Sequence, residues 1–117
     1  MPAPQLDLAR QTAPDTEVAV VALEGKLTLE TVHQFLKQMR PESAAALILD
    51  MSEVEFIDSA GVGALVQLFV HRRGLKQKFA LAGLRQQGRA VIEVCGLLKL
   101  IPCYASVDEA RQSLNSN

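Results

Sequence analysis

The chain has 117 residues, with 12 lysines and arginines against 13 aspartates and glutamates, which gives a formal net charge of −1. This length is typical of one domain with one hydrophobic core, so we expect a single domain over residues 1–117, with flexible ends at 1–4 and 115–117. The near-neutral charge and the lack of a long basic run argue against nucleic-acid binding. No segment approaches ~20 uninterrupted apolar residues, so we expect no membrane span and a cytoplasmic location.

The N-terminal part of the chain predicts a β-hairpin followed by a helix. Residues 6–10 alternate weakly in polarity, 18–23 form an apolar run, and turn residues lie between them. Thr28 then offers an N-cap to a helix with apolar residues at a period of 3.6, which Pro41 ends. The apolar positions of that helix are Leu29, Val32, Phe35, Leu36 and Met39.

The middle of the chain predicts a strand, a loop and a second helix. Residues 45–51 form a buried strand, and the helix runs over 59–73 with Gly74 as its C-cap. The cations at 71–73 suit the negative end of the helix dipole. Its apolar stripe centres on Val62, Leu65 and Phe69. The opposite, smooth outer face is expected to carry Ala60, Gly63, Ala64, Gln67 and His71.

The C-terminal part continues the alternation of strands and helices. We expect a strand over 79–82, a helix from 86 to 96 and a last strand over 100–104. Ser106 and Glu109 have the spacing of a capping box at the start of a final helix. The chain therefore predicts an α/β fold with about four helices and a mixed central sheet, an N-terminal hairpin followed by parallel β-α units.

The cysteines and histidines indicate no metal site. Cys95 and Cys103 fall in apolar patterns, and we expect both to be small core residues rather than a disulfide pair. His33 and His71 lie far apart in the sequence and supply too few ligands for a metal ion. No segment forms a phosphate-binding glycine loop, so no cofactor is expected.

The residues around Ser59 do not form the site of a hydrolase. A nucleophile elbow needs glycine two residues before the serine, where this chain has Ile57, and only Gly61 matches that motif. A serine nucleophile also needs a histidine base, and neither His33 nor His71 has a supporting acid at a telling spacing. We expect no enzyme activity.

Two interpretations of the junction before the second helix stay open on the residues alone. Asp58 and Ser59 are both good N-cap residues and can be purely structural. However, Gly61 and Gly63 each cost the first turns up to about 1 kcal/mol relative to alanine. An exposed hydroxyl beside a smooth outer face suits docking of another protein, although a solvated face has the same composition.

With its DSAG motif at 58–61, the sequence resembles the STAS family of anti-sigma-factor antagonists. This motif is the most specific part of the resemblance. The resemblance covers most of the chain and is carried by Leu49–Ser52, Phe56–Leu65, Ala82–Leu84, Gly96–Leu97, Leu100–Pro102 and Ser106–Ala110. It implies a small α/β domain with a mixed central sheet, in agreement with the alternation of elements.

The resemblance also implies a phosphorylation switch at Ser59. In that family an anti-sigma factor with serine kinase activity phosphorylates the serine of the motif, and a metal-dependent serine phosphatase reverses the modification. The unphosphorylated antagonist binds the anti-sigma factor and frees the sigma factor, while ATP and Mg²⁺ belong to the kinase. Asp58 and Gly61 would support the phosphosite, with Ala60, Gly63, Ala64 and Gln67 in the docking surface.

Thr28 departs from the family pattern. The family often has aspartate after the Gly-x-Leu that follows its second strand, and here Gly25-Lys26-Leu27 precedes Thr28. Thr28 is accordingly included among the docking residues, and its identity can alter the choice of partner. The alternative function is a STAS binding module without phospho-switching, either a ligand sensor or a subunit of a transport or stress-signalling assembly. In either role we expect the chain to be monomeric alone.

Overall fold

Strands and helices alternate along the chain in the computed structural model, which describes residues 5–13 and 17–115. The elements are β1 (Leu6–Arg10), β2 (Val18–Leu27), α1 (Val32–Met39), β3 (Ala46–Ile57), α2 (Ser59–Gly74), β4 (Lys78–Ala82), α3 (Gln86–Val94), β5 (Cys103–Tyr104) and α4 (Val107–Asn115). The predicted flexible ends lie outside the described residues, apart from Asn115, which ends α4.

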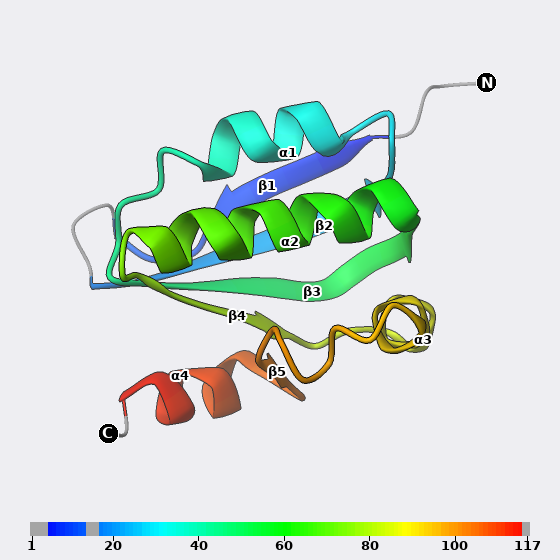
Figure 1. Ribbon diagram of the computed structural model, residues 1–117. Helices are drawn as coiled ribbons and strands as arrows, with labels where there is room; N and C mark the ends of the chain where they lie inside the picture. The colour runs from blue at the N-terminus through cyan, green and yellow to red at the C-terminus, as the bar shows by residue number, and fades with distance from the viewer. Residues whose placement is uncertain (1–4, 14–16, 116–117) are drawn as a thin grey trace.

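Within the described residues, the strands form one mixed sheet in the order β1-β2-β3-β4-β5. β1 and β2 are antiparallel, and the other neighbouring pairs are parallel. Figure 1 shows α1 and α2 on one face of the sheet and α4 on the other. The predicted α/β architecture, with an N-terminal hairpin, parallel β-α units and four helices, is confirmed.

The hydrophobic core is divided between the two faces of the sheet. Leu47 and Leu49 of β3 belong to the larger cluster, which includes Leu65 of α2. Ile48, between them, belongs to a smaller cluster with Ala110 of α4. Successive residues of a strand point to opposite faces, so burial on both faces requires the continuous apolar run with which β3 begins.

β3 is longer than the sequence predicted, because it continues from Met51 to Ile57. Its second half pairs with the end of β2, where Gly25 lies opposite Val54 and Leu27 opposite Ile57. Two register shifts in this pairing break the regular alternation, and only every third residue of this half is buried. Ser52, Glu53 and Glu55 lie between the buried residues, so this half of β3 has the sequence pattern of a loop.

The start of α1 corrects the prediction for Thr28. The N-cap position belongs to Thr31, and the Thr28 carbonyl accepts hydrogen bonds from the N–H groups of Thr31 and Val32, each at 2.9 Å. The Thr31 hydroxyl accepts from the Thr28 N–H at 3.0 Å and donates to the Lys26 carbonyl at 2.7 Å. Residues 28–30 thus form a turn before the helix, and Leu29 is 73% exposed instead of lying on the apolar face.

The predicted burial of Cys95 is wrong. α3 buries Gly88 and Ile92 against the rest of the domain, while Val94 is 86% exposed and Cys95 is also exposed. The spacing of Gly88 and Ile92 places them on one face, and Val94 points away from it. Cys95 follows on the side of Ile92, but it is the C-cap after the last helical residue and is exposed there. Cys103 is half-buried. Burial raises the pKa of the Cys103 thiol, and the charge of Arg89 opposes that rise.

The C-terminal elements begin and end slightly differently from the predictions. β5 contains only Cys103 and Tyr104 of the predicted 100–104. At the start of α4, the Ser106 hydroxyl accepts from the Glu109 N–H at 3.1 Å. The Glu109 carboxylate accepts from the Ala105 N–H at 3.2 Å, one residue before the cap and not at the cap itself. The predicted Ser106 cap is confirmed, and the second bond of the capping box is made to the N–H of Ala105 instead of that of Ser106.

The C-terminal end of α2 also differs by one residue. Gly74 is the last residue of the helix, Leu75 is the C-cap, and Lys76 has a positive φ of 61°. A lysine therefore takes the left-handed position that glycine usually occupies after a helix. The prediction that Gly74 is the C-cap is wrong, because Gly74 stays within the helix.

Arg72 of α2 is buried, with 1% of its surface exposed. Its guanidinium donates three hydrogen bonds to backbone carbonyls: to Lys78 at 3.0 Å, to Glu42 at 3.0 Å and to Ala44 at 2.6 Å. Burial lowers the pKa of Arg72 to about 10, which leaves the group charged at neutral pH. One side chain thus joins the end of α2 to the segment before β3 and to the start of β4.

We predict that Arg72→Ala lowers the free energy of unfolding by about 3 kcal/mol, because three buried carbonyls lose a charged donor. The free energy of unfolding of Arg72→Lys should lie between those of Arg72→Ala and the wild type, since an ammonium group keeps the charge but lacks the planar fork of hydrogen-bond donors. Urea denaturation followed by circular dichroism measures both. The neighbouring Arg73 is exposed, so Arg73→Ala is the control, and an equal loss in that variant would contradict the assignment.

Candidate functional site

Asp58 forms the N-cap of α2 and connects it to the loop before α1. One carboxylate oxygen accepts from the Gly61 N–H at 2.8 Å, and the other accepts from the Leu29 N–H at 3.1 Å. The Asp58 N–H donates to the Leu27 carbonyl at 3.2 Å. Ser59 is therefore the first residue of α2, as the sequence predicted, and it is exposed.

Gly61 allows α2 to lie against the end of β2. A Cβ atom at this position would lie 2.2 Å from the Leu27 carbonyl oxygen and 3.0 Å from a methyl carbon of Ile57. No side chain fits there without a shift of the backbone. In contrast, a Cβ atom on Gly63 would meet no atom within 4 Å among the described residues. The two glycines of the motif therefore have different roles, and only Gly61 is required by packing.

The end of β3 is held by Gln87 of α3, which sequence reasoning missed. The Gln87 side chain accepts from the Ile57 N–H at 2.9 Å and donates to the Ile57 carbonyl at 2.8 Å. β2 pairs with β3 as far as Ile57, but β4 pairs only with residues 46–50 of β3, so an amide side chain bonds the Ile57 backbone beyond the reach of β4. This double hydrogen bond fixes the backbone directly before Asp58.

The outer face of α2 is only partly as predicted. Ala60 and Gly63 are half-buried, and Gln67 is exposed two turns after Ser59. Ala64 is 1% exposed, so its assignment to the outer face is wrong. The buried stripe includes Ala64 and Leu68 because α2 packs against α1 as well as against the sheet. The residues that remain outward are Ser59, Ala60, Gly63, Val66, Gln67, Val70 and His71.

Thr28 lies beside the junction, although it caps no helix. Its neighbours Leu27 and Leu29 are both bonded to Asp58. The Thr28 hydroxyl oxygen is buried, and within the described part of the chain it has no hydrogen-bond partner. Thr28 therefore lies between two residues that Asp58 binds, and its own hydroxyl takes no part in those bonds.

His71 lies too far from Ser59 to act as its base. His71 follows Ser59 by three turns of α2, a separation of about 18 Å along the axis. In the described residues no three His, Cys, Asp or Glu side chains gather in a way that could hold a metal ion. Likewise, none of the described helices combines the length and apolar character needed to cross a membrane. What the junction offers is an exposed hydroxyl at the positive end of a helix dipole.

These features define a small α/β domain with a mixed sheet and an exposed serine directly after the N-cap aspartate of its second helix. The chain belongs to the STAS domain family, whose model matches residues 9–110. Most of the described sheet and all of the Ser59 junction lie within that match.

Solved structures agree with this family. An anti-sigma factor antagonist from Mycobacterium paratuberculosis is 26% identical, with a TM-score of 0.81 and coverage of 96% of both chains. The anti-sigma factor antagonist SpoIIAA in its unphosphorylated form is 22% identical, with a TM-score of 0.75 and coverage of 97% of this chain and 100% of that one. A sulfate transporter family protein from Wolinella succinogenes is 16% identical, with a TM-score of 0.73 and 86% coverage of each. The last two likenesses show the fold alone.

We predict opposite effects for alanine at the two glycines of α2. Gly61→Ala should lower the free energy of unfolding by about 2 kcal/mol, because the new Cβ overlaps the Leu27 carbonyl. Gly63→Ala should raise it by about 0.5–1 kcal/mol, because alanine stabilises a helix wherever space is free. Chemical denaturation measures both, and a stable Gly61→Ala variant would show that the close approach is not required.

Proposed function

We propose that this chain is an anti-sigma-factor antagonist that is switched off by phosphorylation of Ser59. The observation that carries the proposal is the exposed Ser59 hydroxyl at the first position of α2, directly after the Asp58 cap. The likeness to the Mycobacterium paratuberculosis antagonist over nearly the whole chain supports it. In its unmodified form the protein would bind an anti-sigma factor and thereby release the sigma factor.

A phosphate on Ser59 is compatible with the fold. The backbone N–H groups and the dipole at a helix N-terminus favour negative charge, and phosphorylation adds about −1.5 to −2 charge there. The hydrogen bonds that position α2 are made by Asp58 and the backbone, not by the Ser59 side chain. Modification of Ser59 therefore leaves the supporting contacts in place.

The same phosphate changes the surface that a partner meets. Glu53 and Glu55 are exposed on the strand that leads to the junction, and Glu53 is only partly compensated by Arg85, whose nearest nitrogen lies 3.4 Å away. Added negative charge and bulk beside these carboxylates repel an acidic partner surface and raise the cost of desolvation. The switch then operates through local charge and steric effects.

The chain would act as the substrate and not as the enzyme. An anti-sigma factor with serine kinase activity would bind ATP and Mg²⁺, and the Ser59 oxygen would attack the γ-phosphorus with release of ADP. A metal-dependent serine phosphatase would transfer the phosphoryl group to water and restore the hydroxyl. Such a cycle would place the chain in the cytoplasm, and we propose that it is a monomer when unbound.

A second candidate is a STAS module whose serine is never modified. In this role the chain would be a ligand sensor or a subunit of a transport or stress-signalling assembly, and a sulfate transporter family protein has the same fold. Thr28, where the family often has aspartate, is in keeping with a different partner. A neighbouring gene for a kinase-type anti-sigma factor would favour the switch, and a transporter operon would favour the second candidate.

We predict that the cognate anti-sigma kinase, with ATP and Mg²⁺, adds one phosphate to the wild-type chain and none to Ser59→Ala. Mass spectrometry of the intact protein gives the result directly. Ser52→Ala is the matched control, since Ser52 is an exposed serine on the strand before the junction, and this variant should be phosphorylated fully. Equal phosphate uptake by Ser59→Ala would remove Ser59 from the mechanism.

We further predict that Ser59→Asp weakens binding to the anti-sigma factor at least tenfold while the free energy of unfolding changes by less than about 1 kcal/mol. Isothermal titration calorimetry and thermal denaturation give the two quantities. Ser43→Asp is the control, because Ser43 precedes β3 and Ser59 follows it, so the two lie at opposite ends of that strand. Unfolding of Ser59→Asp would instead favour a purely structural role.

A further inference from the structure

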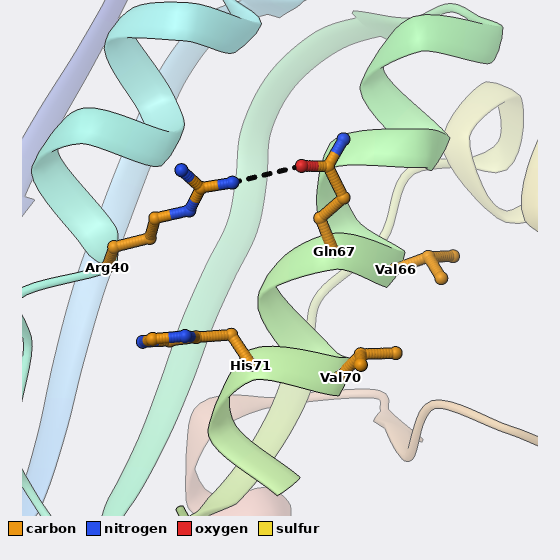
Figure 2. A pocket seen from close by; sticks show the side chains of 5 residues that line it. All are labelled: Arg40, Val66, Gln67, Val70 and His71. Carbon is orange, nitrogen blue, oxygen red and sulfur yellow. Dashed lines mark hydrogen bonds between the residues drawn. The ribbon is translucent and has the colours of Figure 1, made fainter. Parts of the chain in front are cut away.

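An open groove crosses the outer surface of α2 near its C-terminal end, with a volume of about 550 Å³. It is lined by Arg40, Val66, Gln67, Val70 and His71. Figure 2 shows Arg40 reaching from the end of α1 toward Gln67, with His71 on the same side of α2. Val66 and Val70 point to the other side. The groove therefore has a polar, cationic edge and an aliphatic edge.

The groove continues a stripe that begins at Ser59. Ser59, Gly63, Val66 and Val70 follow one another at intervals of four, three and four residues, which places them on one side of α2. Apart from its two neighbours in the chain and the backbone of its own helix, no described residue lies within 4 Å of the space where a Gly63 Cβ would be, and Val70 is 59% exposed. The stripe is about 16 Å long from Ser59 to Val70, and another helix can pack along such a ridge.

The charges of the groove select an acidic occupant. Neither α1 nor α2 contains a carboxylate. The Arg40 guanidinium donates to the Gln67 side chain at 3.1 Å, which holds it over the groove. A purely apolar partner surface would remove this cation from water without compensation, whereas a carboxylate on the partner would form a charge-assisted hydrogen bond with it. Aliphatic side chains on the same occupant would cover Val66 and Val70.

We propose that the groove docks an amphipathic helix of the anti-sigma factor that presents aliphatic side chains to Val66 and Val70 and a carboxylate to Arg40. The inference rests on the proposed function and adds the chemistry of the partner to it. Along α2 the groove begins at Val66, about 10 Å from Ser59, and reaches Val70 at about 16 Å, and both separations exceed the Debye length of ~8 Å at physiological ionic strength. Phosphate repulsion is therefore largely screened at the groove, and we expect this contact to contribute to binding in both states of the switch.

A peptide titration tests the groove without the anti-sigma factor. The probe is an 18-residue helical peptide with leucine on one face and glutamate beside it, and the control peptide has lysine in place of every glutamate. In ¹H–¹⁵N spectra of the full chain, we expect the acidic peptide to shift the amide resonances of Val66, Val70 and His71. The Val70→Asp substitution should weaken binding of the peptide at least tenfold. No shift at millimolar peptide, or equal shifts with both peptides, would overturn the proposal.

Binding to the cognate anti-sigma factor provides the second test. We expect Val70→Asp and Arg40→Glu each to weaken binding at least fivefold, in the wild-type background and in Ser59→Asp alike. Val94→Asp and Lys99→Glu, which change exposed residues of the same types outside the groove, should bind normally. All four positions are exposed, and thermal denaturation verifies that each variant folds.

The outcomes separate the two proposals. Normal binding by Val70→Asp and Arg40→Glu, together with weak binding by Ser59→Asp, would overturn the groove and leave the switch intact. If the wild-type chain does not bind the anti-sigma factor at all, the proposed function fails, and so does the assignment of the groove to that partner. In that case the peptide titration still decides whether the groove binds an acidic helix.

Discussion

The carboxylate of Asp58 sets the position of the helix on which the candidate site depends. Its two oxygens accept from the N–H groups of Gly61 and Leu29, and its own N–H donates to the Leu27 carbonyl. The end of β3, the loop before α1 and the first turn of α2 therefore share one set of backbone contacts. Ser59 is placed by these contacts and makes none of them, so its hydroxyl is exposed on a rigid support.

The opposite end of α2 is held by a different kind of interaction. Arg72 donates to three carbonyls from two other segments, so the helix is fixed at both ends by side chains that bind backbone groups. Before its N-terminal end, Glu53 and Glu55 of β3 are exposed and acidic, and near its C-terminal end Arg40, which follows α1, makes the groove cationic. A helix held in this way presents two chemically different surfaces at a constant separation.

Features that depend on adjacent residues could be predicted from the sequence, and features that depend on distant ones could not. The Asp58 cap and the Ser106 cap follow from chemistry within three residues, and the alternation of elements follows from apolar periodicity. The contacts of Gln87 with Ile57 and of Arg72 with Ala44 join residues 30 and 28 positions apart, so no local pattern signals them. Periodicity likewise gives the width of a buried stripe but not its rotation, which explains the error at Ala64, and it does not show where α3 ends, which explains the error at Cys95.

The hydrogen bonds of α3 to β3 also affect how the protein behaves in concentrated solution. Among residues 5–13 and 17–115, no strand neighbours β3 beyond residue 50 on the side that faces β4, and unpaired strand edges can recruit strands from other chains. Gln87 bonds both backbone groups of Ile57, and Arg85 bonds the Ser52 carbonyl at 2.8 Å. The segment that leads to Ser59 is thereby protected against edge-to-edge aggregation, although it stays accessible to a partner that approaches from the face of α2.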